Sequence, residues 1–258
     1  MAETLKARMQ AGETVLGLLN PYGDPNQAEL LAMSGWDFII FDAEHGSLGP
    51  REVQDLVRAC ERRGCTPLVR TPGREPHMVN RFLDAGSRGI MAPMINDAAG
   101  AAELVRAVKY PPLGARGLAP TRAASFGLAG TLSAYIESAN SETLVIAQIE
   151  TAEAVDRVQE ILACDQVDVV FIGPADLSTS LGHCMDLKHP KVIGAIQNVA
   201  RAVAGSGKHL GILIAQPEQA AMARSLGARF IACYMDSVLV GGCRGFVNAA
   251  RGANASQG

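Results

Sequence analysis

Short, almost uninterrupted apolar runs alternate along this chain with longer segments in which apolar residues recur every three or four positions. Near-continuous hydrophobicity over four to six residues is typical of parallel strands that are covered on both faces. Eight such runs predict β-strands: Val15–Leu19, Asp37–Phe41, Pro67–Arg70, Gly89–Ala92, Leu144–Ile149, Asp168–Ile172, Leu210–Ile214 and Arg229–Cys233.

The segments between the strands carry the periodicity of amphipathic helices. In 51–63, for example, Val53, Leu56, Val57 and Cys60 fall at positions i, i+3, i+4 and i+7. Similar patterns predict helices over 151–163, 192–204, 217–226 and, near the C-terminus, about 237–250. Eight strands alternating with helices favour a closed (β/α)8 barrel over an open doubly wound sheet.

Length and composition narrow the class of protein. The 258 residues are close to the roughly 250 of one such barrel, and no linker divides them, so we expect a single domain over 1–258. A net charge of −3 provides no basic face for nucleic acid. No apolar run reaches the roughly 20 residues of a membrane helix. Six cysteines without paired spacing predict reduced thiols in a cytoplasmic protein.

One segment departs from the alternation of strand and helix. Residues 110–140 contain clustered prolines and glycines and are too long for an ordinary connection between a strand and a helix. We therefore expect them to form a functional loop or a cover.

Polar side chains follow four of the predicted strands at the point where each strand ends. They are Asp42, Glu44 and His45 after the second strand, Arg70 at the end of the third, Gln148 and Glu150 at the fifth, and Asp176 after the sixth. Because the carboxyl ends of parallel strands meet at one mouth of a barrel, we expect these groups to converge there.

Glu150 and Asp176 are the candidate metal ligands. Each follows an apolar strand, where a free charge is costly unless it is paired or ligated. Two carboxylates form a hard oxygen site that suits Mg²⁺ or Mn²⁺, with water or substrate completing the coordination shell. The alternative is that they only cap the next helices or pair with arginine.

Arg70 and His45 are the candidate catalytic side chains. A guanidinium at a strand end can hold a carboxylate or a developing oxyanion, although an ion pair with Asp42 or Glu44 explains its position equally well. His45 is a candidate general base, which Asp84 or Asp42 would orient, or else a histidine that merely caps a helix.

The lysines argue against a Schiff-base mechanism, which needs a shielded lysine on a barrel strand. All five fall in predicted helices, before strands or in loops: Lys6, Lys109, Lys188, Lys191 and Lys208. If carbanion chemistry occurs here, the sequence favours a metal over an iminium as the electron sink.

Six motifs in this order resemble the HpcH/HpaI aldolases, a family of class II pyruvate aldolases that includes 4-hydroxy-2-oxoheptanedioate aldolase and sugar-acid aldolases. The resemblance spans roughly residues 3–250. It rests on Asp42-Ala43-Glu44-His45-Gly46, Leu68-Val69-Arg70, Leu83-Asp84-Ala85-Gly86, the segment Tyr110–Gly117, Gln148-Ile149-Glu150 and the segment Gly173–Leu177.

This resemblance implies an architecture and a cofactor. It implies a (β/α)8 barrel of the pyruvate-binding superfamily that exchanges its C-terminal helix between subunits and forms a homohexamer of paired protomers. It also implies a divalent metal (Mg²⁺, Mn²⁺ or Co²⁺) on Glu150 and Asp176, which binds the oxygens of pyruvate.

The resemblance also implies roles for individual residues. The amides of Ala175 and Asp176 would hold the substrate carboxylate beside Gln148, and Arg70 would stabilise the enolate oxygen. His45, supported by Asp84 and Asp42, would move protons. Leu118 and Leu213 would form walls of the pocket.

The chain departs from the family pattern where the aldehyde half of a substrate would bind. It has Ala232-Cys233-Tyr234-Met235-Asp236 in place of a Gly-Ser-Asp-like turn, and Leu18–Tyr22 where an aromatic residue is more usual at the end of the first strand. The loop 123–130 also differs. Arg116 and Arg122 would meet an acidic substrate tail or pair across a subunit interface.

The sequence thus predicts a metal-dependent aldolase that reversibly cleaves 4-hydroxy-2-oxo acids to pyruvate, or hydroxypyruvate, and an aldehyde. The alternative enzyme is a lyase of CoA esters of the malyl-CoA or citrate lyase type. A third hypothesis is a non-catalytic protein that binds an oxo acid as a sensor or scaffold.

Overall fold

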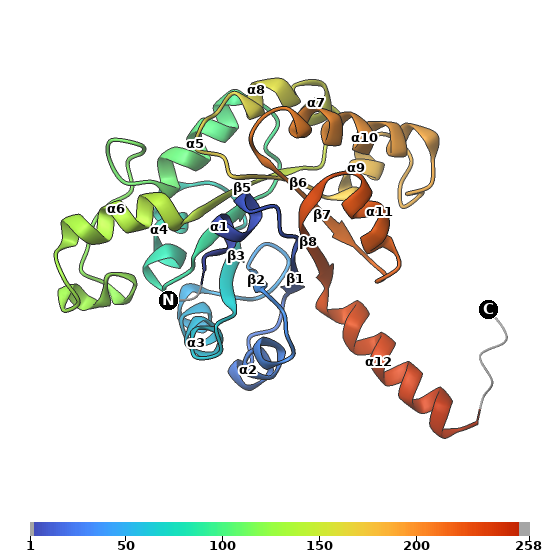
Figure 1. The fold of residues 1–258 in the computed structure, drawn as a ribbon, viewed down its shortest axis with the longest axis horizontal. Helices are drawn as coiled ribbons and strands as arrows, with labels where there is room; N and C mark the ends of the chain where they lie inside the picture. Colours follow the sequence, from blue (N-terminus) through green and yellow to red (C-terminus); the bar gives the residue numbers. More distant parts are fainter. Residues whose placement is uncertain (1–2, 253–258) are drawn as a thin grey trace.

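The computed structural model describes residues 3–252 and shows a closed barrel of eight parallel strands, each paired with its neighbours in chain order (Figure 1). The barrel confirms the predicted fold, and each predicted strand end lies within one residue of the observed one. The strands are β1 (Val15–Asn20), β2 (Phe38–Asp42), β3 (Thr66–Arg70), β4 (Gly89–Ala92), β5 (Leu144–Ile149), β6 (Val169–Ile172), β7 (His209–Ile214) and β8 (Ala228–Tyr234).

Most of the helices cover the outside of this barrel (Figure 1). Their bounds are α1 (Leu5–Gln10), α2 (Pro25–Met33), α3 (Pro50–Glu61), α4 (Pro76–Asp84), α5 (Ala98–Val108), α6 (Leu132–Glu142), α7 (Ala152–Asp156), α8 (Val158–Leu162), α9 (Pro174–Ser180), α10 (Pro190–Ala204), α11 (Gln219–Ser225) and α12 (Met235–Ala250). Proline occupies the first turn of α2, α3, α4, α9 and α10, where its missing N–H costs nothing.

The structure differs from the prediction of a single helix over 151–163 and adds helices within the loop expected over 110–140. The helix expected over 151–163 is divided into α7 and α8 at Arg157, whose φ of −104° and ψ of 15° break the helical geometry. The segment 110–140 contains a 3₁₀ helix (Arg122–Gly127) and the regular helix α6. Helix α6 has no fully buried residue, so its sequence lacks the apolar stripe by which a helix is usually predicted.

The barrel interior is filled by side chains that alternate with outward-facing residues along each strand. Phe38 and Phe230 stack there with ring centroids 4.0 Å apart. A Cβ on Gly17 would lie 2.2 Å from the ring of Phe38, so β1 passes this aromatic pair only because it has glycine there. The interior below the mouth is therefore closely packed around this aromatic pair.

The register of the strands fixes which polar groups meet at the mouth. Asp42 at the end of β2 pairs directly with Arg70 at the end of β3. Across the closure of the barrel, Leu19 of β1 pairs with Tyr234 of β8. The C-terminal ends of these strands thus bring distant parts of the sequence to one opening.

Lys109 lies at the opposite end of the barrel, just after α5. Its side chain is buried, and Nζ donates hydrogen bonds of 2.7 Å to the carbonyl oxygens of Asn140 and Thr143. Burial lowers the pKa of this lysine to about 8. Its position before β5, away from the mouth, agrees with the argument against a Schiff base, and its contacts hold the end of α6 to the barrel.

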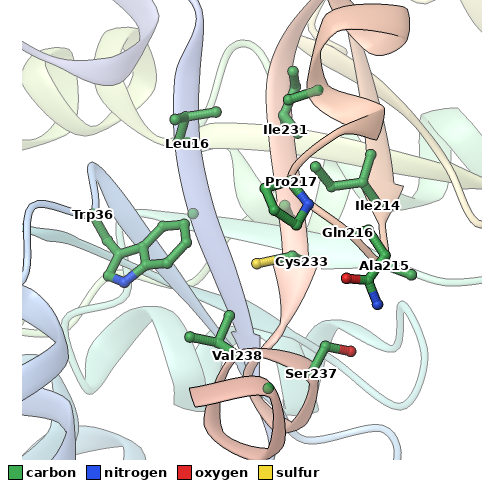
Figure 2. Close-up of a pocket in the computed structure, with 14 residues that line it drawn as sticks. Leu16, Trp36, Ile214, Ala215, Gln216, Pro217, Ile231, Cys233, Ser237 and Val238 are labelled. Carbon is green, nitrogen blue, oxygen red and sulfur yellow. The ribbon is translucent and has the colours of Figure 1, made fainter. Parts of the chain in front are cut away.

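The C-terminal helix α12 does not pack along the barrel but extends away from it (Figure 1). Beyond Met235 its side chains are largely exposed, including Leu239, Phe246 and Val247. The outer face of β1 and β8 that such a helix would normally cover is instead an apolar groove of about 470 Å³, with Leu16 and Trp36 on one side and Pro217 on the other (Figure 2). Among residues 3–252, no helix is long and apolar enough to cross a membrane.

The aromatic pair inside the barrel provides a test of the packing. We expect Phe38→Ala to lower the free energy of unfolding by about 3–5 kcal/mol, because it leaves a cavity against Phe230 and Gly17. Urea unfolding would measure the loss. Phe126→Ala is the matched control, because the Phe126 side chain is 61% exposed. Similar losses for both variants would contradict the interior packing described above.

Candidate active site

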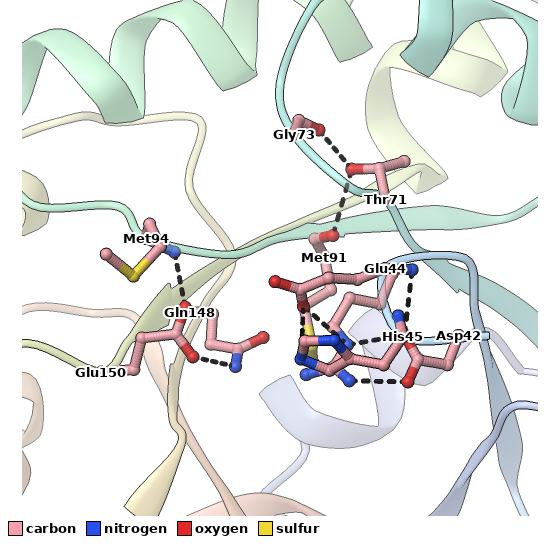
Figure 3. Close-up of polar contacts among 10 residues, drawn as sticks. Asp42, Glu44, His45, Thr71, Gly73, Met91, Met94, Gln148 and Glu150 are labelled. Atoms are coloured by element: carbon pink, nitrogen blue, oxygen red, sulfur yellow. Dashed lines mark hydrogen bonds and ion pairs between the residues drawn. The ribbon is translucent and has the colours of Figure 1, made fainter. Parts of the chain in front are cut away.

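A buried ion pair joins Arg70 and Asp42 at the barrel mouth, where Figure 3 shows Asp42 beside Glu44 and His45. Nε of Arg70 donates to Oδ1 of Asp42 at 2.9 Å, and Nη2 donates to Oδ2 at 2.6 Å. Both residues are 3% exposed. The paired geometry fixes the plane of the guanidinium, whose remaining N–H groups stay available to a ligand.

The Asp42 carboxylate also shapes the turn that follows β2. Its Oδ1 accepts the backbone N–H groups of Glu44 and His45 at 3.1 and 3.3 Å. A Cβ on Gly46 would lie 2.2 Å from the carbonyl oxygen of Asp42 and 2.9 Å from that of Pro21. The tight turn therefore requires glycine after His45, and it presents Glu44 and His45 over the mouth.

Glu44 adds a second carboxylate beside the guanidinium. Its Oε2 lies 3.1 Å from Nε of Arg70, but that N–H points to Asp42, and Oε2 has no hydrogen bond within the described chain. Burial raises the pKa of Glu44, and the charge of Arg70 only partly opposes this. Oε2 of Glu44 is therefore a buried acceptor that remains available to a donor or a cation.

Glu150 follows β5 on the opposite side of the mouth (Figure 3). The backbone N–H of Met94 donates to its Oε1 at 2.7 Å, and Nε2 of Gln148 donates to its Oε2. Burial, with smaller contributions from the charges of Glu44 and Asp176, raises the pKa of Glu150 to about 7. The structure thus brings three carboxylates within electrostatic reach of one another.

These groups fit a divalent cation. The buried Oε1 of Gln148 has no partner within residues 3–252, like Oε2 of Glu44. A Cβ on Gly173 would lie 3.0 Å from Gln148 and 3.1 Å from Glu150, so glycine keeps the space above them open. Over the same residues, no three His, Cys, Asp or Glu side chains converge tightly enough to bind a metal alone. Water and substrate would therefore complete the shell of Glu150 and Asp176.

Helix α9 begins directly after β6 and contains Ala175 and Asp176 in its first turn. The amides of a first helical turn lack acceptors within the helix, and they attract anions. Within residues 3–252, neither of these two N–H groups donates a hydrogen bond. The turn therefore offers N–H groups to a carboxylate beside Gln148 and Glu150.

His45 stands at the open rim of the mouth. Its side chain is 68% exposed, and Nε2 lies 3.9 Å from Oε2 of Glu44. Asp42 contacts the backbone of His45 and not its ring. An exposed imidazole next to a carboxylate can exchange protons with both solvent and substrate.

Asp84 does not lie beside His45 within the chain. It ends α4, just before β4 begins, and is therefore at the far end of the barrel from the mouth. There its Oδ1 accepts a 3.0 Å hydrogen bond from Arg116. The alternation of helix and strand makes this unavoidable, because each helix returns the chain to the starting end of the next strand.

Three more residues singled out in the sequence also lie away from the mouth. Arg122 pairs with Glu61, so neither it nor Arg116 reaches a substrate tail in the same chain. Leu118, which lies between these two arginines in the sequence, is exposed. Leu213, by contrast, faces the barrel interior from β7, on the side of the mouth.

The sequence did not reveal one group that the site depends on, the backbone N–H of Met94. It supports Glu150 from a residue with a φ of 53°, after β4. A main-chain donor leaves no trace in side-chain identity, so no motif could have indicated it.

Known proteins resemble this sequence over nearly its whole length. The HpcH/HpaI aldolase/citrate lyase family model matches residues 16–241. A 4-hydroxy-2-oxo-heptane-1,7-dioate aldolase of Escherichia coli is 36% identical over 99% of this chain and 97% of that protein. A hydroxypyruvate/pyruvate aldolase of Roseovarius nubinhibens is 34% identical over 92% of each.

A solved structure gives the same result at the level of the fold. An HpcH/HpaI aldolase/citrate lyase family protein from Burkholderia cenocepacia superposes with a TM-score of 0.90 at 38% identity, covering 96% of this chain and 98% of that one. The family predicted from the six motifs is confirmed, and the chain belongs to the HpcH/HpaI aldolase/citrate lyase family.

Proposed function

We propose that this protein is a metal-dependent aldolase that reversibly cleaves 4-hydroxy-2-oxo acids to pyruvate, or hydroxypyruvate, and an aldehyde. The observation that carries the proposal is the buried Arg70–Asp42 pair facing Glu150 across the barrel mouth. Relatives at 34–36% identity that bear aldolase names support it. They favour aldol chemistry over a lyase of CoA esters and over a non-catalytic binding role.

Glu150 and Asp176 would hold the divalent cation. Their oxygen ligands suit Mg²⁺ or Mn²⁺, and Co²⁺ can also occupy such a site. When bound, the cation supplies Lewis acidity toward the 2-oxo group of the substrate. Gln148 would orient Glu150 through its side-chain amide, as it does in the structure.

The chain itself positions the oxo acid. The first-turn amides of α9, at Ala175 and Asp176, would receive the substrate carboxylate. Arg70 would donate to the 2-oxo oxygen, where negative charge develops as the C3–C4 bond breaks. Because Asp42 fixes the guanidinium beforehand, little reorganisation is needed when that charge appears.

Cleavage also requires a base for the 4-hydroxyl proton and an acid for C3 of the enolate. His45 is placed to serve both needs, since it lies at the rim and next to Glu44. In the reverse direction, a proton leaves C3 of pyruvate, the new C–C bond forms to the aldehyde carbon, and the aldehyde oxygen gains a proton.

We also propose that the chain works as a homo-oligomer, a hexamer of paired protomers with exchanged α12 helices, in the cytoplasm. The exposed apolar side chains of α12 and the open groove on β1 and β8, which only the first turns of α12 line, support the exchange. The six free cysteines support a reducing compartment. Asp84 can assist His45 only if another copy of the chain supplies it, because its own His45 is at the other end of the barrel.

The first test measures pyruvate release from a racemic 4-hydroxy-2-oxo acid with lactate dehydrogenase as the coupling enzyme. We expect activity to disappear in EDTA and to return with Mg²⁺, Mn²⁺ or Co²⁺. Cleavage of malyl-CoA in place of the oxo acid would instead identify the CoA-ester lyase. Undiminished activity in EDTA would show that Glu150 and Asp176 do not act through a metal.

Arg70→Ala tests the stabilisation of the enolate. We expect kcat to fall on the order of a hundredfold or more, because the developing oxyanion loses its fixed donor. Arg74→Ala is the matched control: this arginine follows the same strand but forms an exposed ion pair with Glu103. Near-normal turnover of Arg70→Ala, with the fold intact by circular dichroism, would refute the assigned role.

Glu150→Gln tests the buried carboxylate. Burial in the folded protein raises the pKa of Glu150 from 4.5 to about 7. Protonation of Glu150 therefore stabilises the metal-free fold below pH 4.5, and this stabilisation is lost as the pH rises through 7. The variant should therefore gain thermal stability over the wild type in EDTA at pH 8 but not at pH 4.5. Calorimetry should show that it no longer binds Mn²⁺. A pH-independent difference in Tm would exclude a raised pKa.

Phe246→Glu tests the role of α12 in assembly. Light scattering should give a wild-type mass near six times the chain mass of 27.1 kDa, and a lower mass for the variant, because a buried interface does not accept the new charge. Arg251→Glu changes a charge just beyond the same helix and should leave the mass unchanged. A monomeric wild type would refute the proposed assembly.

A further inference from the structure

A second pocket opens at the end of the barrel opposite the mouth. It has a volume of about 280 Å³ and lies among α1, the end of α10 and the first residues of β7 and β8. Apolar residues such as Met9 and Leu226 line it together with three basic side chains, Lys208, His209 and Arg229. We call it the basal pocket.

An irregularity in strand pairing places Arg229 at this pocket. Leu210 of β7 pairs with Ala228 of β8, but the next residue, Gly211, pairs with Phe230. Arg229 is therefore an extra residue that has no partner on β7. Such β-bulges are rare between parallel strands, and they occur preferentially where a side chain is redirected toward a functional site.

The three basic side chains, all of them half-buried, keep most of their hydrogen-bond donors available. Within residues 3–252, Nζ of Lys208 donates a side-chain bond of 3.0 Å to the carbonyl oxygen of Asp165, and Nη1 of Arg229 donates one of 3.5 Å to Oγ1 of Thr14. The imidazole of His209 makes none there. Because an ammonium has three N–H groups and a guanidinium has five, a ligand can use the rest.

The carboxylate that faces His209 is already engaged. Asp168 forms an ion pair of 2.7 Å with Lys6, and its Oδ2 accepts the N–H of Val145 at 2.9 Å. Burial lowers the pKa of His209, Arg229 and Lys6 lower it further, and Asp168 opposes the shift. The imidazole is therefore neutral near pH 7 and offers one N–H, while Lys208 and Arg229 contribute two positive charges.

These charges and the size of the pocket indicate a small dianion. A phosphate group carries about −1.5 to −2 charges at pH 7 and has three strong acceptor oxygens, so it balances two cations and accepts donors from several directions. A single carboxylate would leave one positive charge unbalanced. The volume lies just below the roughly 300–1,000 Å³ of pockets for drug-sized ligands, so any organic part is small.

We propose that the basal pocket binds a phosphate dianion, free or as a small monoester, through Lys208, His209 and Arg229. The site is separate from the barrel mouth, because β7 and β8 begin there and end at the mouth. It is also separate from the Arg116–Asp84 pair, which precedes β4, halfway around the barrel from β8. The anion therefore does not compete with an oxo acid.

The test is calorimetric titration of the metal-free protein in EDTA, at neutral pH and constant ionic strength, with inorganic phosphate and with glycerol 3-phosphate. We expect one site per chain. Arg229→Gln and Lys208→Gln should each weaken binding roughly tenfold or more, because each removes a charged hydrogen bond. Arg201→Gln is the matched control, since this arginine of α10 is exposed and donates to Asn198.

The two ligands distinguish the sources of the phosphate. Tighter binding of glycerol 3-phosphate would identify a monoester as the ligand, and the reverse order would identify free phosphate. Malonate, a dianion without phosphorus, should bind more weakly than either, and equal affinity would overturn the assignment to phosphate. Absence of binding to the wild type would overturn the site itself.

The Arg70→Ala variant separates the basal pocket from the mouth. It should bind phosphate as the wild type does, because Arg70 lies at the other end of the barrel. Loss of binding in Arg70→Ala with full binding in Arg229→Gln would place the anion at the mouth and overturn the proposal.

NMR titration of the five histidines provides a readout of position. A bound dianion favours the charged imidazole, so phosphate should raise the pKa of His209 and leave the other four unchanged. His209→Gln assigns the signal. Calorimetric binding with no change in the titration of His209 would show that the anion binds elsewhere.

Discussion

The site depends on one constraint, that a guanidinium buried at 3% exposure must be paired. Asp42 meets this need with two hydrogen bonds to Arg70, because parallel register places the last residues of β2 and β3 side by side. The same carboxylate holds the turn that carries Glu44 and His45. Loss of either partner would leave an uncompensated charge in the barrel mouth, at a cost far above that of an exposed ion pair.

The excess of negative charge around this pair makes the mouth suited to binding a cation. Glu44 and Glu150 both have raised pKa values because burial disfavours their ionised forms. The divalent cation proposed above would relieve that cost by binding the carboxylates that burial destabilises. The closely packed interior beneath, where Phe38 stacks on Phe230, keeps water and ligand at the mouth.

The two ends of the barrel have different tasks. The mouth contains the candidate chemistry, whereas the opposite end contains structural pairs such as Arg116 with Asp84 and the buried Lys109. An apolar groove on β1 and β8 stays open, since only the first turns of α12 line it. Apolar surface of this extent on a helix that points away from its barrel is a feature of proteins that associate.

The sequence by itself determined the strands, the barrel and the grouping of Asp42, Arg70, Glu150 and Asp176, because hydrophobic period and strand ends are local properties. The sequence also identified the family, through six motifs in a fixed order. The tertiary structure alone decided which carboxylate pairs with which basic side chain. Asp84 was a candidate partner of His45 on sequence, but the return of α4 places it at the far end of the barrel. Likewise, only the pairing of β8 with β7 makes Arg229 an extra residue beside the basal pocket, since contacts between strands depend on register and not on local pattern.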